Sequence, residues 1–178
     1  MVVRHKPVLF IDFDRTLFDT DLFYEWLGDE RFSRLLDLTA CKIDPPDFAG
    51  MVYSDSVPFL VRMKETHRLV LLTFAMNTAL QRRKVRGSGL VHYFDDIIMT
   101  QGAKGDEAKY YLESTGDTGW EHAFIDDAPL NIDSVKMVNP HITCIRIDRT
   151  PLPPDQLEAN LRPPDFIVET LGAALHVI

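Results

Sequence analysis

The sequence predicts an α/β fold of the doubly wound type, a parallel sheet covered by helices, with a small helical cap inserted after the first strand. Short apolar segments recur along the chain, as is typical of strands buried on both faces of a parallel sheet. Segments with helical periodicity lie between them. The chain of 178 residues, 46% apolar and 26% charged, has the length and composition of one globular domain with a small insertion.

The expected strands and helices alternate along the chain. The strands are residues 8–11, 68–73, 96–100, 122–126 and 142–147, with a weaker sixth at 166–168. Helical periodicity is seen before the second strand, where Pro58 suits a first helical turn, and then over residues 77–85, 104–113 and 129–137. The proline-rich segment 150–164 is expected to be an extended surface connection.

The interval between the first two strands is longer than one crossover helix requires. It holds a helical pattern over residues 21–38, with Gly28 as a possible interruption, and then a turn-rich stretch at 44–47. We interpret residues 18–54 as a small helical cap and residues 1–17 and 55–178 as the α/β core. Two ordinary crossover helices are the alternative.

Charge and cysteine content limit the partners and the compartment. Nineteen basic against 27 acidic residues give a net charge of −8, which disfavours binding to nucleic acid or to an anionic membrane. The two cysteines, Cys41 and Cys144, lack metal-ligand spacing, and no signal or spanning segment is evident near the N-terminus. We therefore expect a cytoplasmic protein that acts on a small molecule; the oligomeric state stays open.

Acidic residues follow two of the expected strands. Asp12 and Asp14, with Thr16 next in the alternation, come after the first strand, so both carboxylates face one space. Such a pair is costly without a cation or a proton between them. Alone, it would indicate two exposed acids in a turn. However, Asp126 and Asp127 end the fourth strand, and the carboxyl ends of parallel strands meet at one edge. The oxygens gathered there suit Mg²⁺.

The second and third expected strands bring phosphate-binding groups to the same edge. Thr73 ends the second strand with a hydroxyl that can donate to a phosphate oxygen, and Lys104 follows the third and can neutralise developing negative charge. Lys109, five residues further on, is the alternative lysine. Together with the carboxylates, these groups predict phosphoryl transfer.

These motifs resemble those of the haloacid dehalogenase-like hydrolase superfamily, in its phosphatase branch. The resemblance covers residues 8 to about 147 in the family's order, through FIDFDRTL, LVLLT, Lys104 and FIDDAPLNI. It implies a Rossmann-like core in which Asp12 is the nucleophile of an aspartyl-phosphate intermediate and Asp14 the general acid and base. The remaining implied roles are Mg²⁺ binding by Asp12, the Asp14 carbonyl and Asp127, phosphoryl binding by Thr73 and Lys104, and support from Thr16, Asp126 and Asn131.

The second aspartate indicates the reaction class. Relatives that cleave carbon–halogen bonds or drive ion pumps lack an aspartate at the position of Asp14, so the resemblance implies a phosphatase or a phosphomutase. We expect a Mg²⁺-dependent phosphomonoester hydrolase acting on a small phosphorylated metabolite. A phosphomutase is the alternative. A receiver-type signalling domain is disfavoured by the order of the motifs, and a non-catalytic phosphate-binding domain by the presence of every catalytic residue type.

Three further features have two interpretations each. The basic run 81–86 is expected to be a solvated helix face rather than an anion-attracting one. Arg15 is expected to face solvent rather than a substrate anion. The aromatic residues Phe23, Tyr24 and Trp26 could line a pocket for an apolar or aromatic leaving group or could pack in the core.

Overall fold

The protein contains a single sheet of six parallel strands. The structure, a computed structural model, describes residues 6–117, 121–149 and 160–178. The strand order is β3-β2-β1-β4-β5-β6, and every pairing is parallel. This confirms the predicted fold class. The strands are β1 (Val8–Ile11), β2 (Arg68–Phe74), β3 (Asp96–Thr100), β4 (Ala123–Asp126), β5 (Thr143–Ile147) and β6 (Phe166–Val168).

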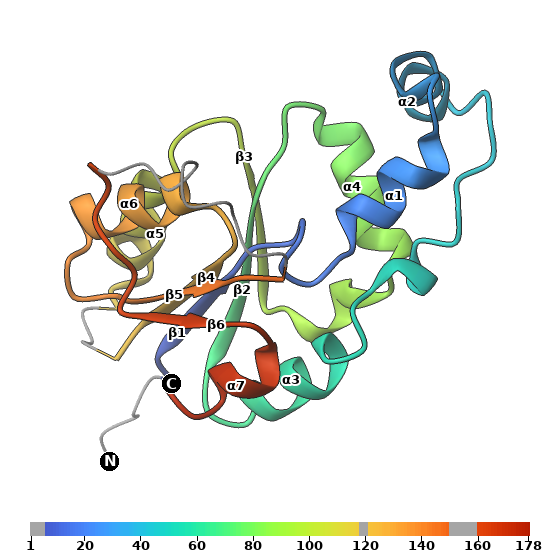
Figure 1. The fold of residues 1–178 in the computed structure, drawn as a ribbon. Helices are drawn as coiled ribbons and strands as arrows, with labels where there is room; N and C mark the ends of the chain where they lie inside the picture. Colours follow the sequence, from blue (N-terminus) through green and yellow to red (C-terminus); the bar gives the residue numbers. More distant parts are fainter. Residues whose placement is uncertain (1–5, 118–120, 150–159) are drawn as a thin grey trace.

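Helices cover both faces of the sheet (Figure 1). They are α1 (Thr20–Leu27), α2 (Arg31–Thr39), α3 (Ser56–Met63), α4 (Thr78–Gly87), α5 (Lys104–Thr115), α6 (Pro129–Val138) and α7 (Leu171–Ala174), with 3₁₀ turns η1 (Ala49–Met51) and η2 (Leu90–Tyr93). Side chains alternate along each strand, so Val8 and Phe10 pack against α5 and α6. Leu9 and Ile11 pack on the opposite face, in the cluster that includes α3, α4 and α7.

The central strand explains where a site can form. All four residues of β1 are buried, and β1 is flanked by β2 on one side and β4 on the other. The strand order therefore reverses direction at β1, and ligands bind in such sheets beyond the carboxyl ends of strands at this point.

Residues 18–54, which we interpret from the sequence as a helical insertion, follow β1 and contain α1, α2 and η1. Gly28 ends α1 with a φ of +66°, a conformation that glycine adopts without steric cost, so residues 20–39 form two helices. In Figure 1, α1 and α2 lie beside α4, away from α5 and α6. The division into core and cap stays a prediction.

The two ends of the insertion lie side by side. The Asp19 amide donates to the Met51 carbonyl at 2.7 Å and the Tyr53 amide to the Leu17 carbonyl at 3.0 Å. Arg149, after β5, donates to both oxygens of Asp55 and to the Thr16 carbonyl, each at 2.8 Å. These contacts hold the entry and the exit of the insertion together.

The structure also describes the two cysteines, the lengths of the helices and part of the proline-rich segment. Cys144 is buried in β5 and Cys41 is exposed, and both are free thiols. In the parts of the chain that the structure describes, the helices are too short or too polar to cross a bilayer. Of the predicted extended connection, residues 150–159 lie outside the described residues.

Candidate active site

The carboxyl ends of three neighbouring strands bring the predicted site residues together. Asp12 follows β1 directly, and its amide donates to the Ile125 carbonyl of β4 at 2.9 Å. Asp126 ends β4, and Thr73 lies near the end of β2. Lys104 is the first residue of α5. All four residues are buried, and the parallel register places them at one edge of the sheet, as the sequence predicts.

Lys104 joins two of the carboxylates. Its ammonium donates to Asp12 and, at 2.7 Å, to Asp126. Burial by itself would lower the pKa of Lys104, but the charges of Asp12 and Asp126 outweigh it and raise that pKa, so the side chain stays an ammonium. Lys109, the alternative lysine, is exposed on α5, so Lys104 is the lysine that reaches the site.

Both carboxylate oxygens of Asp126 accept hydrogen bonds from other groups of the protein. Its oxygens accept from the Ala128 amide at 2.9 Å and from the Asn131 side chain at 3.0 and 3.1 Å, in addition to Lys104. These contacts fix the carboxylate that orients Lys104, which is a supporting role for Asp126 and Asn131.

Three carboxylates lie close enough to share a cation. Oxygens of Asp12, Asp126 and Asp127 lie within 4.8 Å of one another. Burial, together with neighbouring carboxylates, raises the pKa of Asp12 well above its usual value, and burial and Asp126 raise that of Asp127 to about 7. One ammonium faces three carboxylates, and a hard divalent cation would compensate the excess charge. The residues fit a Mg²⁺ site; ligation by the Asp14 carbonyl stays a prediction.

Asp14 has partners that the sequence analysis did not identify. Its carboxylate accepts from Thr20 at 2.7 Å, from Gln81 at 2.6 Å and from the Lys84 ammonium. Burial by itself raises the pKa of Asp14, but Lys84 and the hydrogen bonds outweigh it, and the pKa lies below its usual value. Gln81 also donates to Thr73 at 2.8 Å, so one glutamine links two predicted site residues.

The predicted solvated face of α4 is therefore wrong for the two polar residues Gln81 and Lys84 of the basic run. Gln81 and Lys84 are only 6% and 4% exposed, whereas Arg82 and Arg86 are exposed as expected. The reason is the position of α4, which begins after Thr73 and turns one face toward the site. Gln81, Lys84 and Val85 share that buried face; their three- and four-residue spacing after a site strand is the sequence signal that was available.

Aromatic rings surround the Lys84 ammonium. Its nitrogen lies 5.5 Å from the ring centre of Phe13, 5.0 Å from that of Phe18 and 5.3 Å from that of Phe23. Cation–π attraction of this kind lowers the cost of burying the charge. The ring of Phe23 belongs to α1, so the insertion contributes to the environment of Asp14.

The loop after Asp14 places Arg15 at the entrance of the site. Arg15 has a φ of +57°, and its guanidinium pairs with Asp21 at 2.7 Å with half of each side chain exposed. Arg15 is thus both solvent-accessible and part of the cavity lining. Thr16 does not line the cavity; its hydroxyl is buried and has no hydrogen-bond partner within the described residues.

A cavity of about 560 Å³ lies over these groups. Its floor contains Asp12, Thr73 and Lys104, and Asp14 and Asp127 also line it. Phe23 and Tyr24 line the wall, but Trp26 does not. Trp26 instead stacks on Phe23, with ring centres 6.2 Å apart, and lies under Arg34. Of the two interpretations of the aromatic residues, the structure supports the pocket for Tyr24, packing for Trp26, and both for Phe23, which is 2% exposed and belongs to the core.

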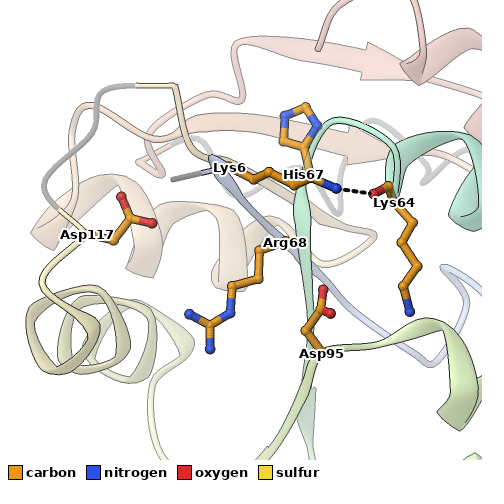
Figure 2. Close-up of a pocket in the computed structure, with 6 residues that line it drawn as sticks. All are labelled: Lys6, Lys64, His67, Arg68, Asp95 and Asp117. Atoms are coloured by element: carbon orange, nitrogen blue, oxygen red, sulfur yellow. Dashed lines mark hydrogen bonds between the residues drawn. The ribbon is translucent and has the colours of Figure 1, made fainter. Parts of the chain in front are cut away.

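A second, smaller cavity of about 240 Å³ lies at the amino ends of the strands (Figure 2). It is lined by Lys6, Lys64, His67, Arg68, Asp95 and Asp117. Lys6 donates to the Lys64 carbonyl at 2.7 Å, as the dashed line in Figure 2 shows. Arg68 pairs with Asp96 at 2.7 Å. These charged side chains are spread around the cavity and do not converge on one point.

Comparison with known proteins supports the fold. No family model and no curated protein sequence matches the chain. A solved structure assigned to the haloacid dehalogenase-like hydrolases, from Burkholderia xenovorans LB400, has a TM-score of 0.77 at 19% identity over 97% of this chain and 96% of its own. A phosphatase of that type from Thermococcus onnurineus has a TM-score of 0.69 at 19% identity over 97% of both chains.

A magnesium-bound hydrolase of the same type from Bacillus subtilis has a TM-score of 0.65 at 14% identity over 98% of this chain and 99% of its own. Dehalogenases are among the matching structures as well. The chain therefore has the fold of the haloacid dehalogenase-like hydrolases, which confirms the resemblance at the level of the fold.

Proposed function

We propose that the protein is a Mg²⁺-dependent phosphomonoester hydrolase of the haloacid dehalogenase type, acting through an aspartyl-phosphate on Asp12. The observation that carries this proposal is the convergence of Asp12, Lys104 and Asp14 on one cavity floored by carboxylates. A phosphoryl group there would meet a nucleophile, a buried cation and a proton-transfer group together.

In the first step a carboxylate oxygen of Asp12 attacks phosphorus and the bond to the leaving oxygen breaks. The leaving oxygen takes a proton from the hydrogen-bonded pair of Asp14 and Lys84, which releases an alcohol. Lys104 and the Thr73 hydroxyl, which line the cavity, would bind the transferring phosphoryl oxygens. Mg²⁺, held by Asp12 and Asp127, would supply further positive charge to those oxygens.

In the second step Asp14 accepts a proton from water, which attacks the phosphorus of the aspartyl-phosphate. The bond to Asp12 breaks, inorganic phosphate leaves, and the proton restores the Asp14–Lys84 pair. Gln81 and Thr20 hold the Asp14 carboxylate in both steps. Acid–base assistance of this kind serves an alcohol leaving group and has no use for a halide, so Asp14 favours a phosphatase over a dehalogenase.

Release of inorganic phosphate from p-nitrophenyl phosphate tests the proposal. We expect turnover with Mg²⁺, none with a chelator, and a loss of about four orders of magnitude or more in Asp12→Asn. Asp106→Asn, an exposed carboxylate on α5, is the matched control and should keep full activity. Full turnover by Asp12→Asn, or halide release from a 2-haloacid without phosphate release, would contradict the proposal.

A further inference from the structure

We infer that the site selects phosphomonoesters of apolar or aromatic alcohols, and discriminates against sugar phosphates and against substrates with a second anionic group. This inference rests on the proposed function and adds the class of the leaving group. The evidence for it is the set of side chains that form the wall of the cavity, and not the carboxylates at its floor.

The wall above the carboxylates is largely apolar. Phe23 and Tyr24 come from α1 and Leu35 from α2, whereas Phe74 ends β2, Met76 lies in the loop after it and Leu80 lies in the first turn of α4. Several of these side chains are exposed, with Met76 at 83% and Phe74 at 46%. A leaving group that is apolar would cover them and remove that surface from water.

Three polar side chains of the same wall already have partners within the protein. Thr20 donates to Asp14, and Gln81 donates to Asp14 and Thr73. Asn77 accepts from the Leu80 amide at 3.1 Å and donates to the Thr39 hydroxyl at 3.0 Å. The hydroxyl groups of a sugar would therefore lose water without gaining equivalent hydrogen bonds from these side chains.

The cations that line the cavity are also paired. Lys104 contacts Asp12 and Asp126, Lys84 contacts Asp14, and Arg15 contacts Asp21 at the entrance. A second phosphate or a carboxylate on the leaving group would have to compete with one of these carboxylates. A neutral leaving group avoids that competition.

Two phosphate esters of primary alcohols test the inference. Because both release a primary alcohol, the chemistry at the leaving oxygen is the same and only the rest of the leaving group differs. The Mg²⁺-loaded enzyme is assayed with 3-phenylpropyl phosphate and with glucose 6-phosphate, by release of inorganic phosphate. We expect kcat/KM to be higher for 3-phenylpropyl phosphate by about tenfold or more. Adding a carboxylate at the far end of the phenyl ring should remove most of that advantage.

Neighbouring leucines on α2 provide a matched pair of variants. Leu35 lines the cavity, whereas Leu36 is 55% exposed and does not. Leu35→Asn should lower kcat/KM for 3-phenylpropyl phosphate by about tenfold, mainly through KM, and so reduce its preference over glucose 6-phosphate. Leu36→Asn should change neither. Met76→Asn, at a lining position that is 83% exposed and where folding is not at risk, repeats the test in the loop after β2.

The outcomes separate the inference from the proposed function. If glucose 6-phosphate is hydrolysed as well as 3-phenylpropyl phosphate, or if Leu35→Asn and Leu36→Asn behave alike, the leaving-group inference is overturned and the phosphatase stands. If none of the phosphate esters releases phosphate, p-nitrophenyl phosphate included, the proposed function itself is wrong.

Discussion

The two ends of the sheet hold similar charged side chains in different environments. At the carboxyl ends, Lys104 is 1% exposed and binds two carboxylates that are themselves buried. At the amino ends, Arg68 and Asp96 form a pair with side chains 40% and 43% exposed. Lys64 there donates to the backbone carbonyls of His92 and Tyr93 at 3.3 and 3.2 Å.

This difference in burial indicates that the charges at the carboxyl ends are kept for function and not for stability. Burying ions costs free energy that pairing does not fully return, whereas an exposed pair contributes little either way. The carboxyl end concentrates this cost in one place and even leaves negative charge in excess. Buried charges gathered in a cleft are the usual mark of a functional site, whereas the Arg68–Asp96 pair at the amino end is largely exposed.

The largest expected effect is the loss of the buried cation. Lys104→Met leaves Asp12, Asp126 and Asp127 without their ammonium, so the free energy of unfolding at neutral pH should fall by about 3–5 kcal/mol. Urea denaturation with a chelator present measures it. Lys109→Met, on the exposed side of the same helix, should be nearly neutral. Equal effects of the two substitutions would mean that the buried ion pairs of Lys104 do not contribute to the free energy of unfolding.

Asp127 should make the stability of the metal-free protein depend on pH. The pKa of Asp127 is raised to about 7, against about 3.9 when unfolded, so the metal-free native state binds the extra proton between these values. Stability should therefore fall as pH rises from about 4 to 7, by a few kcal/mol at most, and then level off. Asp127→Asn should reduce this slope in urea titrations at pH 5 and pH 8, whereas Asp106→Asn should retain it.

Substitution of Lys84 tests the part of the site that α4 contributes. Lys84→Met leaves Asp14 without its cation, so stability should fall by about 1–3 kcal/mol. Turnover of p-nitrophenyl phosphate should fall by about ten- to a hundredfold, because the proton-transfer group loses its partner. Arg82→Met, exposed on the same helix, is the control. Unchanged turnover in Lys84→Met would remove Lys84 from the proton-transfer pair.

The smallest effect should come from the amino end. Arg68→Met breaks an exposed pair, so thermal and urea denaturation should shift by less than about 1 kcal/mol. Activity on p-nitrophenyl phosphate should match that of the unsubstituted protein. A loss of activity here would show that the two ends of the sheet are coupled.

The strands and the residues after them could be predicted because they depend on short-range sequence. Val8–Ile11 is apolar throughout and ends in Asp12, and parallel strands must bring Asp12, Thr73 and Asp126 to one edge. The choice of Lys104 over Lys109 followed from its distance to the preceding strand.

The residues around Asp14 were missed because they depend on packing between distant segments. A lysine within a basic run is expected in solvent, and only the rings of Phe13, Phe18 and Phe23 make a buried position for Lys84 possible. Similarly, helical periodicity places both Phe23 and Trp26 on α1 but does not say which ring faces the cavity. That choice depends on how the insertion sits against α4.

Arg149 has a consequence for how the protein could change during evolution. By holding Asp55 and the Thr16 carbonyl at once, it fastens the chain where residues 18–54 begin and where they end. Segments of different length and sequence can then be exchanged between these two points while β1 and the loop with Asp12 and Asp14 keep their place.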